Sequence, residues 1–275
     1  AAVAPMAVGF AGLKDRHAVT RQAFSVHLPG QAGPDWAALE IPGVRIVSAQ
    51  RHNRKLKRGA HRGNRFRIVL RDVRGDRAAA EQRLGLIASE GVPNYFGEQR
   101  FGRDGENLRS ALALFGGARL GRSQRGFALS AARSWLFNRL LGLRVSDGSW
   151  NQGVEGEVWM LAGTHSIFGP QPHDAELLAR VARFDIDPTG PLWGRGALRS
   201  EGRAAELEHA AAALEPRMAA GLVTTDMAQE RRSLRLLAQD FSYSWLGDDV
   251  LEVSFRLPAG TFATAVLREL CDWQA

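Results

Sequence analysis

The sequence predicts an α+β fold, in which a mixed, mostly antiparallel sheet is combined with helices. Short stretches alternate between apolar and polar residues and end at turn residues, most clearly at 66–71 and 250–257. Between them lie Ala- and Leu-rich stretches with helical spacing, and the two kinds of element do not follow the regular order of a βαβ array. The 275 residues, 45% apolar and 24% charged, are enough for one large domain or two ordinary ones.

The expected strands have the clearest patterns. Residues 24–29 (FSVHLP) alternate and stop at a Pro-Gly turn, and residues 44–49 resemble a second strand. In the third, Phe66, Ile68 and Leu70 share one face. In the last, VLEVSFRL at 250–257, the apolar residues again share a face until Pro258 ends the strand.

Helices are expected wherever Ala and Leu recur with a period near 3.6. The expected ranges are 77–89, 106–115, 129–141, 203–220 with Pro216 near its end, and 261–271. Residues 143–200 differ from the rest in composition and periodicity, because they contain many Gly and Pro and few long periodic runs. This segment, with the Ala-rich helix after it, suggests a domain inserted into a core of strands and helices.

Composition excludes several classes of protein. No uninterrupted apolar run is long enough to span a membrane, and the opening AAVAPMAVGF lacks the basic start of a signal peptide. Cys271 is the single cysteine, so an intrachain disulfide is excluded and a cytoplasmic location is favoured. Its helix is largely apolar, so Cys271 is expected to pack in a core. The sequence sets no oligomeric state, and a monomer is favoured.

The charge favours a polyanionic partner. Lys and Arg number 36 against 29 Asp and Glu, which gives a formal net charge of +7. Nearly all the basic residues are arginines, which reflects either a GC-rich genome or forked contacts to phosphate. The densest part is RHNRKLKRGAHRGNRFRIVLR at 51–71, with nine Lys or Arg and no acid before Asp72. It is either a solvated loop or, since it continues into the strand at 66–71, a fixed phosphate-binding surface.

Metal and nucleotide chemistry have little support. The histidines show no metal-ligand spacing, and the loop with His165, His173 and Asp174 is more typical of polar surface than of a ligand set. No phosphate-binding glycine loop of either common type is present, and Gly-x-Ser-x-Gly is absent. The sequence therefore gives no support to a metal site or to a nucleotide cofactor.

Two segments could carry chemistry of their own. In GFAGLKDRHAVTRQAFSV (9–26), Asp15 stands between Lys14 and Arg16, which favour its ionised form. The alternative is an ordinary exposed turn residue. In VPNYFGEQRFGRDGENL (92–108), three aromatics lie among glycines and arginines. They are either core residues or rings that stack on unpaired bases.

These segments together resemble the TruD family of tRNA pseudouridine synthases. GLKDRHAVTRQ is similar to the family signature around its catalytic aspartate, and PNYFGEQRFG to its second signature. RKLKRGAHRGNRFRIVLR resembles its basic strand motif, and LPAGTFATAVLREL its C-terminal motif. GVEGEVWMLAGTHSIF and DPTGPLWG are more faintly similar to parts of its insertion domain.

The resemblance implies a fold and a reaction. The fold is a pseudouridine-synthase core at 1–117 and 237–275, interrupted by a TRUD insertion domain at 118–236. A strand with a Lys and a Phe, which the family carries before this point, has no counterpart here, so the N-terminal part of the core is expected to be missing. The reaction detaches uracil from ribose C1′ and rejoins it through C5, usually at uridine thirteen in the D arm of tRNA, without metal or cofactor.

The resemblance also implies roles for individual residues. Asp15 is the catalytic carboxylate, acting as nucleophile at C1′ or as base at C2′. Phe96 holds the flipped uracil, and Asn94 bonds to its edge or fixes Asp15. We expect the Phe96 ring to be open on one side and Tyr95 to pack inward, and Arg268 is a weaker candidate to pair with Asp15. RNA-binding roles fall to Arg54, Lys55, Lys57, Arg58, Asn64 and Arg65.

Two rival functions remain open from the sequence. One is a tRNA-binding or RNA-folding protein that keeps the fold but has lost turnover. The other is a nucleoside or DNA glycosylase, which would also need one acid and a flipped base but would release free uracil.

Overall fold

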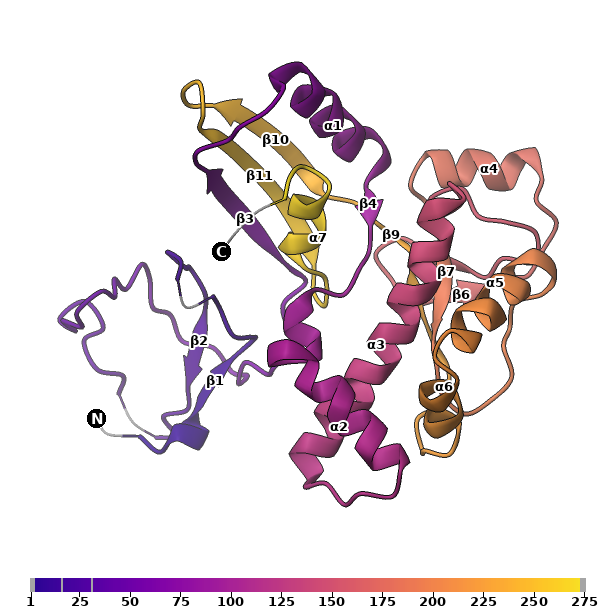
Figure 1. Ribbon diagram of the computed structural model, residues 1–275. Helices are drawn as coiled ribbons and strands as arrows, with labels where there is room; N and C mark the ends of the chain where they lie inside the picture. The colour runs from indigo at the N-terminus through magenta and orange to yellow at the C-terminus, as the bar shows by residue number, and fades with distance from the viewer. Residues whose placement is uncertain (1–2, 16, 31, 273–275) are drawn as a thin grey trace. The chain divides into compact units, whose positions relative to one another are not determined.

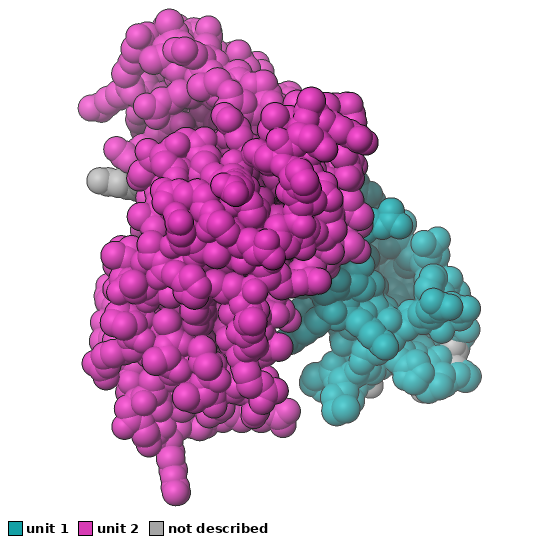
Figure 2. All heavy atoms as spheres, turned by 90° about the vertical axis from the view of Figure 1, so that its right-hand side faces the viewer, with its two compact units in different colours: residues 1–64 teal, residues 65–275 magenta. Residues whose placement is uncertain are grey.

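The computed structural model describes residues 3–15, 17–30 and 32–272. They form two compact units, residues 1–64 and residues 65–275, which Figure 2 distinguishes by colour. None of the helices in the described part of the chain combines the length and apolar character needed to cross a membrane.

The first unit is built on a small antiparallel ladder. After a short 3-10 turn, η1 (Pro5–Ala7), strand β1 (Val8–Phe10) pairs with β2 (Phe24–Val26). β2 confirms the strand expected at 24–29, although it is shorter. The strand expected at 44–49 is wrong: Val44 makes only an isolated bridge, and Val47 is 58% exposed. Its alternating residues have no sheet against which to bury a face.

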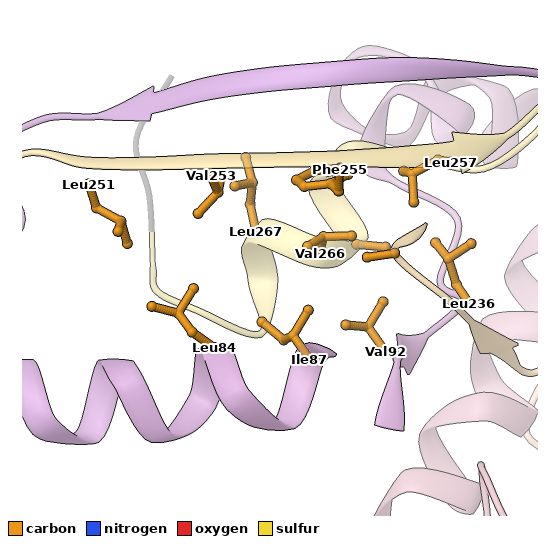
Figure 3. Packing of buried hydrophobic residues seen from close by; sticks show 12 residues of the cluster. Leu84, Ile87, Val92, Leu236, Leu251, Val253, Phe255, Leu257, Val266 and Leu267 are labelled. Atoms are coloured by element: carbon orange, nitrogen blue, oxygen red, sulfur yellow. The ribbon is translucent and has the colours of Figure 1, made fainter. Parts of the chain in front are cut away.

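The second unit contains the sheet in which the two clearest predicted strands are confirmed. The order of strands is β10 (Gln239–Trp245), β11 (Leu251–Pro258), β3 (Gly63–Leu70). Helices α1 (Arg77–Glu90) and α7 (Ala263–Arg268) lie on one face of it (Figure 3). The alternating apolar residues of β11 point toward these helices and form one buried cluster with Leu84, Ile87 and Val266. Burying this face is the main favourable contribution to the layer.

A second sheet and its helices lie further along the chain (Figure 1). Its strands, in order, are β6 (Ile167–Phe168), β5 (Trp159–Leu161), β7 (Ile186–Leu192) and β8 (Glu230–Ser233). The helices in this part are α3 (Arg122–Ser146), α4 (Ala175–Ala182), α5 (Gly202–Ala213) and α6 (Pro216–Val223). A two-residue ladder joins β4 (Val92–Pro93) to β9 (Arg235–Leu236). Both antiparallel sheets and the helices agree with the α+β prediction.

Three helix predictions needed correction. The helix expected at 261–271 is shorter, since α7 ends at Arg268 and does not include Cys271. The helix expected at 129–141 is confirmed, but α3 begins earlier, at Arg122, and runs for 25 residues. The single helix expected at 203–220 is instead two helices, because Pro216 opens α6. Proline suits the first turn of a helix, where its missing N–H leaves no bond unmade, and it disfavours a helical conformation in the residue before it.

The connection from β4 to α3 contains short turns. η2 (Glu98–Phe101) and η3 (Arg103–Gly105) lead into α2 (Glu106–Phe115), and α3 packs against α2. Gly91, just before β4, has φ of +79°, and a Cβ there would lie 2.7 Å from the Leu236 carbonyl oxygen. Only glycine allows the chain to approach β9 this closely. This approach fixes the position of β4, from which residues 94–101 continue.

Candidate functional site

Asp15 lies in the first unit, on the exposed segment between β1 and β2. On one side of it, the Lys14 ammonium donates a hydrogen bond to the Asn64 side-chain oxygen. The other neighbour, Arg16, lies outside the described residues. Gly12 is close to the His61 ring, because a Cβ there would lie 3.2 Å from His61 Cε1. The aspartate motif is therefore packed beside the end of the basic segment.

The basic segment 51–65 is fixed along β1 rather than free in solvent. The Leu56 amide donates to Ser25 Oγ at 2.8 Å, and the Gly59 amide donates to the Ala11 carbonyl at 2.7 Å. A Cβ at Gly9 would lie 2.3 Å from the Leu56 carbonyl oxygen, so the two backbones are in direct contact. The segment is thus held on β1 and β2, whereas the prediction had it fixed by the strand at 66–71 into which it continues.

The six predicted RNA-binding residues are not equally available. Arg54, Lys55, Lys57 and Arg58 are all exposed. Lys55 also donates to the Met6 carbonyl, and the Arg58 guanidinium carbon lies 5.3 Å from the Phe10 ring centroid. No ion pair with a described carboxylate involves these four. The other two have partners within their units, although Arg65 stays exposed. Asn64 accepts from Lys14, and Arg65 forms an ion pair with Asp240 at 3.1 Å within the second unit.

Asn94 lies in the second unit, directly after β4, and is 4% exposed. Its side-chain amide donates to the Ser233 carbonyl at 2.8 Å. Its side-chain oxygen accepts from Arg232 Nη2 at 2.6 Å. Both ends of the amide are thus bonded to β8, and the direct effect of Asn94 is to hold Arg232 in place.

The Phe96 ring is buried, at 7% exposure. It packs edge-on against Phe137 and Phe262, with ring centroids 5.6 and 6.1 Å away. The Arg232 guanidinium carbon lies 4.1 Å from the Phe96 ring centroid. The expectation that Phe96 is open on one side while Tyr95 packs inward is therefore wrong, because it is Phe96 that packs inward. Tyr95 is the more exposed of the two rings, and the aromatic signal in the sequence does not distinguish which ring enters the core.

Two arginines beside Phe96 were not among the predicted site residues. Arg232 Nη1 donates to the Gly260 carbonyl at 3.1 Å, and the Arg100 guanidinium carbon lies 5.3 Å from the Phe96 centroid. Burial, together with the nearby charge of Arg100, lowers the pKa of Arg232 to about 9, so the group stays cationic at neutral pH. The sequence could have indicated Arg100, which lies in PNYFGEQRFG, but nothing in ERRSLR marks Arg232.

The remaining candidates take structural positions. Arg268 is exposed on α7, where its guanidinium carbon lies 4.9 Å from the Tyr95 ring centroid. Cys271 is half-buried and reduced, and burial raises the pKa of its thiol. The described residues contain no group of three or more His, Cys, Asp or Glu that could hold a metal ion. The structure thus brings together Asn94, Phe96, Arg100 and Arg232 in the second unit, and Asp15 with the basic segment in the first.

Comparison with known proteins identifies the family. The model of the family "TruD: tRNA pseudouridine synthase D" matches residues 2–111 and 104–270. The tRNA pseudouridine synthase D of Xanthomonas axonopodis pv. citri is 52% identical over 99% of this chain and 78% of its own length. The Methylococcus capsulatus protein of the same name is 49% identical, with the same coverage.

A solved structure supports the fold independently. The crystal structure assigned as a tRNA pseudouridine synthase D (TruD) from Methanosarcina mazei superposes with a TM-score of 0.74. It covers 98% of this chain and 82% of its own, at 19% identity, so it bears on the fold alone. The high-identity relatives and the family match decide the rest: this chain belongs to the TruD family of tRNA pseudouridine synthases, which are isomerases.

Proposed function

We propose that this protein isomerises a uridine of tRNA to pseudouridine, at uridine thirteen of the D arm, with Asp15 as its single catalytic carboxylate. The observation that carries the proposal is the GLKDRHAVTRQ motif, in a chain that matches tRNA pseudouridine synthases D over nearly its full length. Asp15 is exposed, as a carboxylate that must reach a nucleotide has to be.

The reaction needs one acid rather than two. The bond from C1′ to N1 breaks, the base rotates, and a bond from C1′ to C5 forms. The C5 proton is then lost and N1 is left protonated, so no water is consumed. Asp15 serves either as a nucleophile at C1′ or as a base that removes the C2′ proton. In glycosidases a second carboxylate activates a water molecule. Because no water reacts here, a second carboxylate is not needed.

We assign the tRNA contacts as follows. The basic segment contributes Arg54, Lys55, Lys57, Arg58, Asn64 and Arg65 to the phosphate backbone, where arginine and lysine supply a salt-dependent attraction. We also assign Asn94 and Phe96 to the target uracil. Because both are buried, Asn94 acts through the Arg232 that it holds, and Arg232 has to move off the Phe96 ring before the ring can stack on a base. The catalytic core comprises 1–117 and 237–275, and the insertion domain comprises 118–236, a range that includes the sheet of β5 to β8.

The test is turnover by the purified protein on an unmodified tRNA transcript. We expect pseudouridine at one position, found by nucleoside analysis and by sequencing after carbodiimide labelling. Asp15→Asn keeps the shape of the side chain and removes its charge, so it should lower the rate by about 10⁴-fold or more, while a gel shift shows unchanged tRNA binding.

The matched control is Asp35→Asn. Asp35 is an exposed aspartate of the same unit that accepts a hydrogen bond from the Ala37 amide at 3.0 Å, and its replacement should leave turnover unchanged. Turnover by Asp15→Asn within tenfold of the unchanged protein would overturn the role of Asp15. Binding without any turnover would favour the RNA-folding alternative, and release of free uracil would favour a glycosylase.

A further inference from the structure

A shallow depression lies on the second unit where η2 meets the first turns of α3. We call it the α3 surface, and it is lined by Arg100, Arg122, Ser123, Gly126, Phe127 and Ser130. Arg122, Ser123 and Phe127 are exposed, and the Phe127 ring is 61% exposed.

Arg100 is the first reason to look for an anionic ligand here. Its Nη1 donates to Ser130 Oγ at 3.2 Å, whereas its buried Nε has no partner. Burial lowers the pKa of Arg100. No described carboxylate forms an ion pair with Arg100 or with its neighbour Arg232.

Other buried arginines of the second unit are compensated. Carboxylates pair with the guanidinium groups of Arg133 (Glu230, 3.3 Å), Arg144 (Glu157, 2.7 Å), Arg231 (Glu208, 2.8 Å) and Arg235 (Asp187, 2.6 Å). Leaving a partly buried charge unpaired costs free energy, and an anion that arrives from outside removes this cost. The exception at Arg100 and Arg232 therefore indicates a place for such an anion.

The charge pattern of the sequence gives an independent second reason. Between Glu106 and Asp147 the chain carries seven arginines and no acid. Arg119, just before α3, and Arg122 and Arg125, in its first turn, are exposed and form no ion pair with a described residue. The N-cap of α3 is Gly121, which has no side chain to accept from the first amides of the helix. The same end of the helix adds positive potential.

We propose that the α3 surface binds a backbone phosphate of the RNA substrate through Arg100 and Arg122, with Phe127 placed to stack on an adjacent unpaired base. This inference rests on the proposed function, because it names a second RNA contact for the same substrate. A guanidinium fork suits a phosphate, and a stacking ring beside it is typical of nucleic-acid surfaces rather than of sites for acidic proteins.

The sharpest test uses Ser130, because its hydroxyl accepts from Arg100 and is not itself charged. Ser130→Asp places a carboxylate beside Arg100. Ser130→Asn introduces a side chain of nearly the same shape as aspartate, but without the charge. Binding of an unmodified tRNA transcript should weaken by about tenfold in the first variant and change less than twofold in the second. The log-affinity against log-salt slope should flatten by about 0.7–0.9 in the first only.

A second pair separates a specific contact from general charge. Arg122→Gln should weaken binding, whereas Arg203→Gln, with the same charge change at an exposed position of α5, should not. Melting temperatures report whether each variant is folded. Equal binding by Ser130→Asp and Ser130→Asn, or equal losses in the two Gln variants, would overturn the inference.

The two proposals fail in different ways. Binding is measured without turnover, so a chain that binds through the α3 surface but forms no pseudouridine contradicts only the proposed function. A chain that forms pseudouridine but binds equally well with either Ser130 variant contradicts only the α3 surface.

Discussion

The Asn138 side chain bonds to both the amide and the carbonyl of Phe96, as the backbone of a neighbouring strand would. The Asn138 side-chain oxygen accepts from the Phe96 amide at 2.9 Å, and its amide donates to the Phe96 carbonyl at 3.0 Å. The ring is thereby aimed at Phe137, and Arg232 closes over it. A residue fixed in this way belongs to the core.

Phe96→Ala should therefore destabilise the protein. The change removes a buried ring from a cluster that includes Phe137, Leu140 and Leu234, and it leaves a cavity. Truncations of buried phenylalanines of this kind cost about 3–5 kcal/mol. The free energy of unfolding, measured by urea denaturation, reports the loss.

Phe127→Ala is the control for this prediction, because its ring is 61% exposed and its removal should change stability by less than about 0.5 kcal/mol. If Phe96→Ala unfolds at the same urea concentration as the unchanged protein, the ring does not support the core and its burial has been misassigned.

At the scale of the element, the basic segment shows how a charged loop becomes a surface. Its backbone bonds to Ala11 and its contact with Gly9 hold it on the β1–β2 ladder, so Arg54 and Lys57 project from a fixed base. Fixed charges lose less conformational entropy on meeting a phosphate than charges on a free tail. This supports tRNA contact by the segment itself.

Replacing Arg54 and Lys57 together with Ala should weaken tRNA binding and flatten its salt dependence. For each phosphate that the variant no longer neutralises, the slope of log affinity against log salt should fall by about 0.7–0.9, and any structured RNA should be affected alike. Fluorescence titrations at several salt concentrations measure the slope.

The double variant Arg183→Ala and Arg203→Ala removes the same charge from exposed positions outside the segment, and it should leave the slope unchanged. An unaltered slope in the Arg54 and Lys57 variant would show that the segment is only a solvated surface.

For the molecule as a whole, sequence patterns predicted the elements that bury one regular face. β11 and α1 belong to this group, because their apolar residues meet in a single cluster. β10 was missed because most of its residues are exposed and polar. The strands within 143–200 are short and interrupted by Gly and Pro, so no alternation is long enough to detect.

The candidate site was predicted in the same uneven way. Asp15 and Asn94 lie in local motifs, which a sequence displays directly. The surroundings of Asn94 are not visible in a local motif. Arg232 follows Asn94 by more than a hundred residues and reaches it only because β8 pairs with its neighbours. Which arginines have a carboxylate partner depends on the folded chain, and no local pattern records it.

The two units differ in the number of buried residues that they contain. This difference predicts which unit unfolds locally first. Of the described residues in 1–64, only Gly9 is buried, whereas 65–275 contains several apolar clusters. Regions with little buried apolar surface open with low free energy. Limited digestion with trypsin should therefore cut within 1–64 before it cuts within 65–275, as read by mass spectrometry of the first fragments.

Bound tRNA should then slow a particular subset of these early cuts. The bonds after Arg54, Lys55, Lys57 and Arg58 should become resistant if the basic segment meets the phosphate backbone, because a protease needs an accessible and locally extended chain. Added casein, digested in the same tube, shows that the RNA does not inhibit trypsin itself. First cuts inside 65–275 would contradict the difference in stability, and unchanged cutting at 54–58 in saturating tRNA would remove the basic segment from the RNA interface.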